Sequence, residues 1–145
     1  MAKYSQGIFV PKNPAKLVGN QTVHFRSSWE LTFMTFLDTH PSVIQWASES
    51  IRIPYVNPLT GKSTIYIPDF LIIYRDKAGT IKREMIEVKP KKETTMEAAK
   101  TRRDKAFVIL NSAKWMAAMA FCKKNSITFR VVNEDSIYQQ RGKKK

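Results

Sequence analysis

Three charged residues stand out in this sequence because apolar neighbours surround them. Asp69 lies between a proline and a phenylalanine, and Glu87 lies between an isoleucine and a valine, two positions before Lys89. A buried carboxylate is costly unless another group compensates its charge. Side chains alternate along a strand, so Glu87 and Lys89 point to the same face. We therefore expect the two acids and the lysine to act as one group.

Such a group suits the hydrolysis of a phosphodiester bond. Two neighbouring carboxylates repel each other unless a cation lies between them, and oxygen ligands suit a hard ion such as Mg²⁺, or Mn²⁺ in its place. That ion would polarise a phosphate oxygen and lower the pKa of a bound water, while Lys89 would orient the water. The alternative is a solvated strand face on which Glu87 and Lys89 form an ordinary ion pair.

The hairpin that contains both acids must position them. Residues 64–68 and 70–74 are expected to form one strand that continues past its proline, and residues 81–89 are expected to form the returning strand. A turn with an acidic residue and a glycine joins the two strands. In such a hairpin Asp69 lies across from Glu87.

A helix is expected before this hairpin, over residues 28–39. Ser27 is a favourable N-cap, and Glu30 completes a capping box three residues later. Four apolar side chains recur at helical spacing and should face the core: Trp29, Phe33, Phe36 and Leu37.

The other expected elements complete a sheet with helices beside it. Strands are expected over residues 43–47, 51–55 and 127–132. A long helical region is expected over residues 96–124, with a potential break at residues 111–112. One stripe of this helix should face the core: Val108, Ser112, Trp115, Met119 and Cys122.

This order of elements predicts a mixed α/β domain, with a central mixed β-sheet flanked by helices. The length of 145 residues suits one domain, expected over residues 27–138. Residues 1–26 are expected to be an extended or irregular arm that lies on DNA or on a partner, the alternative being an ordinary tethered terminus. Residues 139–145 are expected to form a disordered basic tail.

The composition favours a polyanionic partner. The chain has 25 Lys and Arg against 12 Asp and Glu, a net charge of +13, which favours nucleic acid. Charge alone does not distinguish a nuclease from a passive DNA-binding protein. No run of about 18 apolar residues predicts a membrane span. Cys122 is the single cysteine, so no intramolecular disulfide is expected, and with His24 and His40 it makes a poor zinc ligand set.

The motif Pro68-Asp69, followed one hairpin later by Glu87-Val88-Lys89, resembles the signature of the PD-(D/E)XK nuclease superfamily. This resemblance implies a restriction-endonuclease-like fold and hydrolysis of DNA with Mg²⁺. It further implies that Asp69 and Glu87 bind the metal with help from the Val88 carbonyl, and that Lys89 positions the attacking water.

The preceding helix extends the resemblance. Residues 28–30, 37–38 and 41–43 are similar to the start of the transposase-endonuclease branch of this superfamily. Many of its relatives carry a glutamate on a helix before the sheet that joins the metal site. The resemblance therefore implies that Glu30 completes the acidic cluster, in addition to its capping role.

Residues 1–7, 46–50 and 57–61 resemble the head-completion nucleases of T4-like tailed phages. This implies that the chain trims double-stranded DNA at filled heads in the host cytoplasm, before the tail joins, and contacts phage capsid, portal or neck proteins. Two alternatives stay open: a non-enzymatic DNA-binding joining protein of the virion, and a nuclease of transposition or repair, such as a junction resolvase.

Basic residues around the site are candidates for contacts with DNA phosphates, although a solvated surface explains each one equally well. They are Arg26, Lys91, Lys92, Lys100, Arg102 and Arg103. Glu49, in a serine-flanked loop, is a weaker candidate for the acidic cluster, and His24 is a weak candidate for a base.

Overall fold

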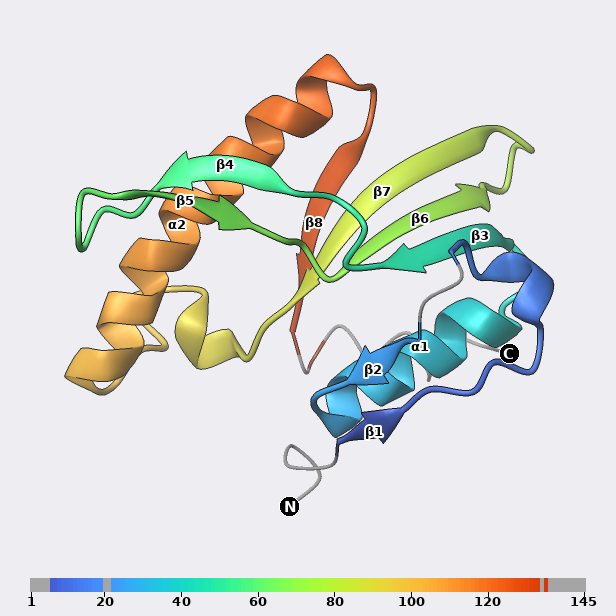
Figure 1. Cartoon of the computed structure of the whole chain (residues 1–145), viewed down its shortest axis with the longest axis horizontal. Coiled ribbons are helices and arrows are strands. Elements are labelled where there is room, and N and C mark those ends of the chain that lie inside the picture. The colour runs from blue at the N-terminus through green and yellow to red at the C-terminus, as the bar shows by residue number, and fades with distance from the viewer. Residues whose placement is uncertain (1–5, 20–21, 134, 136–145) are drawn as a thin grey trace.

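A four-stranded sheet forms the centre of the chain, in a computed structural model that describes residues 6–19, 22–133 and 135. The strand order is β3-β6-β7-β8, and Figure 1 shows the strands side by side. Neighbours pair antiparallel, except that β7 and β8 are parallel. The strands are β3 (Val43–Ser48), β6 (Phe70–Arg75), β7 (Ile81–Val88) and β8 (Thr128–Val132).

The helices α1 (Ser28–Thr39) and α2 (Arg102–Lys124) cover opposite faces of this sheet. Ile86 of β7 packs in one core cluster with Phe33 of α1, whereas Met85 packs in a second cluster with Ala118 of α2. Because successive strand residues point to opposite faces, the two clusters lie on the two sides of the sheet. The predicted mixed α/β fold is confirmed.

Helix α1 begins where the sequence predicts. The Ser27 hydroxyl accepts a hydrogen bond of 3.1 Å from the backbone N–H of Glu30. The second half of the capping box differs, because Oε1 of Glu30 accepts from the backbone N–H of Arg26 at 2.7 Å instead of from Ser27. Of the four residues expected to face the core, Phe33 and Leu37 are fully buried, and the other two pack partly buried against the same cluster.

The strand expected to continue past Pro68 is two strands in different sheets. β5 (Ser63–Tyr66) pairs with β4 (Ile53–Val56) in a separate two-stranded sheet, and β6 begins only at Phe70. Proline has no N–H to donate to a strand ladder, so the pairing ends there and the chain crosses to the central sheet. Asp69 consequently lies at this crossing, one residue before β6.

Helix α2 starts later than expected and is unbroken. Thr101 caps it, its hydroxyl accepting from the N–H of Asp104 at 3.0 Å, and the preceding chain forms the short 3₁₀ helix η3 (Lys91–Glu93). Asn111 does not break α2, because its buried amide donates to the Glu93 carbonyl at 3.0 Å. Two residues of the expected stripe are exposed, Ser112 and Met119, and Ala118 is buried in that region.

The N-terminal segment lies against its own chain. β1 (Gly7–Ile8) pairs with β2 (His24–Phe25). The chain that connects these two strands contains the 3₁₀ helix η2 (Pro14–Lys16). The buried Asp38 carboxylate of α1 accepts the backbone N–H groups of Lys12 and Asn13 at 2.9 and 3.1 Å. The described part of the expected arm is therefore tethered to α1.

The expected tail, residues 139–145, lies outside the described residues. Among the described helices, none has the length and apolar character needed to cross a membrane.

Candidate active site

Asp69 and Glu87 lie together at the end of the β6–β7 hairpin. Phe70 pairs with Ile86, so Asp69 continues the register opposite Glu87. Oδ2 of Asp69 accepts the backbone N–H of Val88 at 2.8 Å, and the backbone N–H of Asp69 donates to Oε1 of Glu87 at 3.3 Å. The structure thus brings the two acids together as expected, even though the strand before Asp69 is interrupted.

Glu87 is held by contacts on both carboxylate oxygens. The side chain is buried, with the residue 4% exposed. The Tyr66 hydroxyl donates to Oε1 at 2.8 Å, and Oε2 lies 3.7 Å from Nζ of Lys89. Tyr66 belongs to the second sheet, so both sheets contribute to the position of Glu87.

Burial disfavours ionisation of both acids, and neighbouring carboxylates add to this effect at Asp69. The pKa of Asp69 is raised well above its usual value by burial, by Glu87 and by Glu30, while the hydrogen bond from Val88 opposes the rise. Burial also raises the pKa of Glu87, and Lys89 and the Tyr66 hydrogen bond oppose it. The pair therefore has the electrostatics of a cation site, since a cation would relieve both penalties.

Glu30 faces this pair from the first turn of α1. Its half-buried carboxylate is held by the Arg26 N–H, and its pKa is raised first by burial. Its charge raises the pKa of Asp69, which indicates that it lies on the same side. No three His, Cys, Asp or Glu side chains among the described residues are grouped closely enough to hold a metal as they stand. The structure therefore provides a close pair of acids with Glu30 nearby.

Arg26 and Glu49 form an ion pair at the edge of this group. The Arg26 guanidinium bonds both carboxylate oxygens of Glu49, the second at 3.3 Å. Glu49 has a left-handed backbone conformation with φ of 51°, and its N–H donates to the Asp69 carbonyl at 2.9 Å. Arg26 is thus close to the carboxylates, as a DNA-binding role would require, but its side chain is paired with Glu49.

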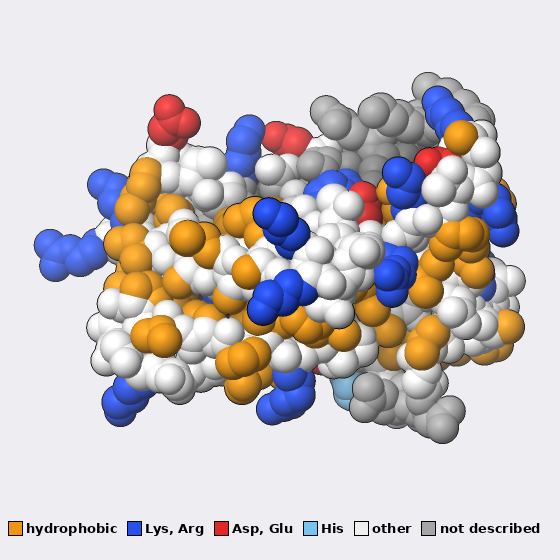
Figure 2. Space-filling model, turned by 90° about the horizontal axis from the view of Figure 1, so that it is seen from above, with side chains coloured by type: hydrophobic (Ala, Val, Ile, Leu, Met, Phe, Trp, Pro, Cys, Tyr) orange, Lys and Arg blue, Asp and Glu red, His pale blue; other side chains and the backbone are white. Residues whose placement is uncertain are grey.

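The other predicted DNA-binding residues are exposed. Lys91 pairs with Asp135 at 3.0 Å, and the Arg103 guanidinium lies 5.5 Å from the Phe107 ring centroid. Within the described residues, no hydrogen bond or ion pair joins the carboxylates to Lys92, Lys100, Arg102 or Arg103. On the face in Figure 2, Lys and Arg side chains project singly among apolar and uncharged ones. The basic charge of that face is therefore dispersed.

Two residues at the site were not predicted from the sequence. They are Tyr66 and Lys114. Lys114 of α2 lies with its ammonium 5.6 Å from the Tyr66 ring centroid. The sequence does single out Lys114, because it is the only charged residue between positions 106 and 122, in an otherwise uncharged stretch of the predicted helix.

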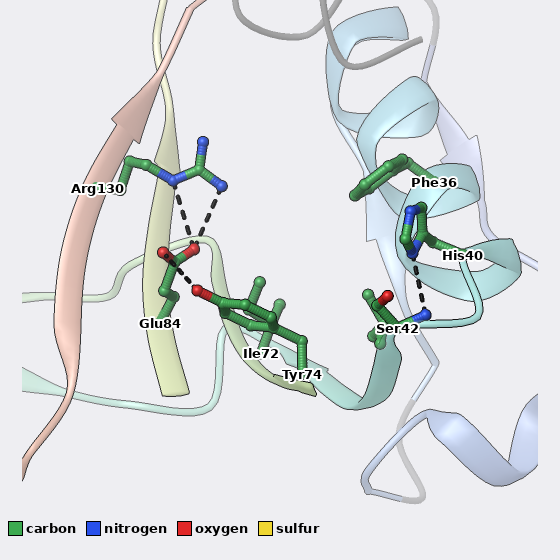
Figure 3. A pocket seen from close by; sticks show the side chains of 8 residues that line it. Phe36, His40, Ser42, Ile72, Tyr74, Glu84 and Arg130 are labelled. Atoms are coloured by element: carbon green, nitrogen blue, oxygen red, sulfur yellow. Dashed lines mark hydrogen bonds and ion pairs between the residues drawn. The ribbon is translucent and has the colours of Figure 1, made fainter. Parts of the chain in front are cut away.

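A separate pocket of about 190 Å³ lies on the α1 face of the sheet and does not contain the acidic pair. Figure 3 shows Arg130, Glu84 and Tyr74 on one side of it, facing Phe36 and His40. Arg130 bonds Glu84 at 3.2 Å, and the Tyr74 hydroxyl donates to the same carboxylate at 3.3 Å. Because its acid is already paired, this pocket lacks the electrostatics found at Asp69 and Glu87.

Comparison with known proteins agrees with this geometry. Residues 40–134 match the family described as TnsA-like endonuclease N terminal. The chain is also 36% identical over 142 residues to the head completion nuclease of Enterobacteria phage T4, a match that covers 90% of this chain and 92% of that protein. The chain therefore belongs to the TnsA-like endonuclease family, within the PD-(D/E)XK nucleases.

Proposed function

We propose that this chain is a Mg²⁺-dependent deoxyribonuclease whose active site comprises Asp69, Glu87, Lys89 and Glu30. The observation that carries the proposal is the pair formed by the half-buried Asp69 and the buried Glu87, joined by the 2.8 and 3.3 Å bonds, with Glu87 also 3.7 Å from Lys89. If Glu87 and Lys89 formed only a structural ion pair, the second carboxylate, Asp69, would not be needed beside Glu87, where burial disfavours its charge.

The donor set fits a hard divalent cation. Among the described residues Oδ1 of Asp69 accepts no hydrogen bond, and Oε2 of Glu87 has only the Lys89 contact. Asp69 and Glu87 would hold the ion with the Val88 carbonyl, and Glu30 would complete the acidic cluster. Mg²⁺ usually keeps several waters and takes one or two protein carboxylates, which accounts for the small number of protein ligands here; Mn²⁺ would substitute. The bound ion would supply electrophilic stabilisation of the phosphate.

The protein residues then organise the hydrolysis. Lys89, placed by its contact with Glu87, orients the water that attacks phosphorus in line with the leaving group. A P–O bond to the water oxygen forms and the P–O3′ bond breaks. The attacking water releases one proton to solvent and the leaving 3′ oxygen takes one up, so the products are a 5′-phosphate and a 3′-hydroxyl. Tyr66 keeps Glu87 in place by its hydrogen bond.

DNA would bind mainly through its phosphates. The net charge of +13 gives a sequence-independent, salt-sensitive affinity for the duplex. We assign these contacts to Arg26, Lys91, Lys92, Lys100, Arg102 and Arg103. Lys92, Lys100, Arg102 and Arg103 are exposed, whereas Arg26 would have to exchange its Glu49 partner for a phosphate.

The biological role we propose is head completion in a tailed phage, where the chain trims packaged double-stranded DNA before the tail joins. The support is the match to the T4 head completion nuclease over nearly the full length of both proteins. Capsid, portal or neck proteins would be its partners. A role in transposition is the second candidate, favoured only by the family match.

Metal binding tests the site without reference to cleavage. Thermal unfolding is followed with increasing Mg²⁺ for the wild type, Asp69→Asn and, as a matched control, Asp135→Asn, whose acid is exposed. Mg²⁺ at about a hundred times its Kd should stabilise the wild type and the control by roughly 2–3 kcal/mol, and Asp69→Asn much less. Equal stabilisation of all three proteins would refute the proposed metal site.

Head completion is tested with phage heads assembled without this protein. Adding the wild type should restore joining of tails and infectious particles. Asp69→Asn should fail if trimming is required. Restoration by both proteins would support the joining-protein alternative, and restoration by neither would refute the role in head completion.

A further inference from the structure

Lys114 is a half-buried cation beside the acidic pair. It lies in the middle of α2, next to Trp115, which packs in the same cluster as Tyr66. Its ammonium is 5.6 Å from the centroid of the Tyr66 ring, and the hydroxyl of that ring bonds Glu87. Lys114 is therefore directed toward the site by the same tyrosine that positions Glu87.

The ammonium of Lys114 has no anionic partner within the described part of the chain. Among the described residues Lys114 forms no ion pair and donates no hydrogen bond, whereas Lys89 pairs with Glu87. Contact with an aromatic ring compensates a half-buried cation only in part. The core side of α2 thus retains a cation whose hydrogen-bonding capacity is unused.

Lys89 and Lys114 are close enough for their charges to interact. The pKa of Lys114 is lowered first by burial and then by Lys89, while Glu87 and Asp69 oppose this. Two like charges held together, with an ion-pair partner for only one of them, favour an anion between or beside them. A DNA phosphate is the anion that this site would meet.

We propose that Lys114 is a second cationic residue of the active site, which binds a non-bridging oxygen of a backbone phosphate of the DNA strand held there. This inference rests on the proposed function, because it assumes that DNA enters between Lys89 and α2. Lys114 would then hold the phosphate from α2, while Lys89, directly after β7, orients the water that attacks it.

The test compares Lys114→Met, which removes the charge and keeps an apolar stem, with Lys114→Arg and Lys123→Met. Lys123 is an exposed lysine of the same helix, nine residues further on and about 13 Å along its axis. All variants are made in an Asp69→Asn background, so that DNA binding is measured in Mg²⁺ without cutting. The probe is a short fluorescent duplex, followed by anisotropy at several salt concentrations.

We expect Lys114→Met to weaken binding about ten- to a hundredfold, the range for loss of a charge-assisted hydrogen bond. Its salt dependence should fall by about one phosphate contact, and Lys114→Arg should restore both. Lys123→Met should change affinity much less. Duplexes with single methylphosphonates should identify one phosphate that Lys114 contacts. Neutralising this phosphate should weaken DNA binding by the protein that retains Lys114, but not DNA binding by Lys114→Met.

Two outcomes would overturn this proposal. One is a Lys114→Met protein that matches Lys123→Met in affinity and salt dependence. The other is loss of cleavage in an otherwise wild-type Lys114→Met protein with no change in salt dependence, which would mean that Lys114 only supports the Tyr66 ring. Failure of the proposed nuclease would be separate, because the wild type would then bind DNA without cutting it.

Discussion

The Tyr66 hydroxyl donates a 2.8 Å hydrogen bond to Oε1 of the buried Glu87. Tyr66 belongs to the two-stranded sheet and Glu87 to the central sheet, so this bond connects the two at the site. Burial and the charge of Glu87 raise the pKa of Tyr66, which keeps the phenol protonated and a donor throughout the working pH range. The bond stabilises the ionised form of Glu87, the form that would bind a metal.

Tyr66→Phe should shift the pH dependence of cleavage. Without the hydroxyl, the pKa of Glu87 should rise further, because a hydrogen bond that stabilises its ionised form is lost. Because the ionised acid is required, the acidic limb of kcat/KM against pH should move to higher pH. Tyr55→Phe, on the neighbouring strand β4, is the matched control. An acidic limb at the same pH in Tyr66→Phe and wild type would contradict this role.

The free energy of unfolding of the metal-free protein should fall as pH rises, because carboxyl pKa values at the site are raised. The pKa values of Asp69, Glu87 and Glu30 are all raised in the folded state, mainly by burial. The folded protein therefore binds more protons than the unfolded chain above about pH 4, and these groups lower the free energy of unfolding as pH rises through their folded pKa values.

This pH effect is measured as a difference between variants. From about pH 5 to pH 8 in EDTA, Asp69→Asn should gain free energy of unfolding relative to the wild type, because it no longer carries the carboxylate whose ionisation is disfavoured. Urea denaturation at each pH measures the difference, with Asp135→Asn as the control for removing an exposed acid. A difference that stays constant or decreases with pH would show that the Asp69 pKa is not raised.

Asp38 should be important for stability and not for chemistry. This residue is 2% exposed, and its carboxylate accepts the N–H groups of Lys12 and Asn13, which fix the N-terminal segment on α1. Asp38→Ala should lower the free energy of unfolding by about 2–3 kcal/mol, because it leaves those donors without their charged acceptor. Chemical denaturation measures the loss, with exposed Glu97→Ala as the control. At a temperature where the variant is folded, kcat should be unchanged.

The elements that local patterns define were predictable from the sequence. The Ser27 cap and the apolar spacing fixed helix α1, and the Asp76 turn fixed the β6–β7 hairpin. The alternation around Glu87 then placed it on one face with Lys89. These features depend on residues close in sequence, which is why the acidic pair could be expected.

Features that depend on long-range packing were missed. The segment before Pro68 pairs with β4 in a second sheet, and the sequence of 64–74 does not specify that partner. Helix α2 starts only at its Thr101 cap, after the short helix η3 and a stretch of turns over residues 94–101. Lys114 reaches the site only because α2 packs beside Tyr66, 48 residues earlier (114 − 66), and no local pattern encodes that contact.

The most direct measurement is cleavage of linear and closed circular duplex DNA by purified protein, with Mg²⁺ and with EDTA, beside Lys89→Met. Cutting should require Mg²⁺, and the variant should lose at least about a hundredfold in rate while it keeps its fold and most of its DNA binding. Loss of the circles would show that the enzyme cuts internally. A well-folded wild type that binds DNA but never cuts it in Mg²⁺ or Mn²⁺, or a Lys89→Met protein that cuts at the wild-type rate, would contradict the assigned active site.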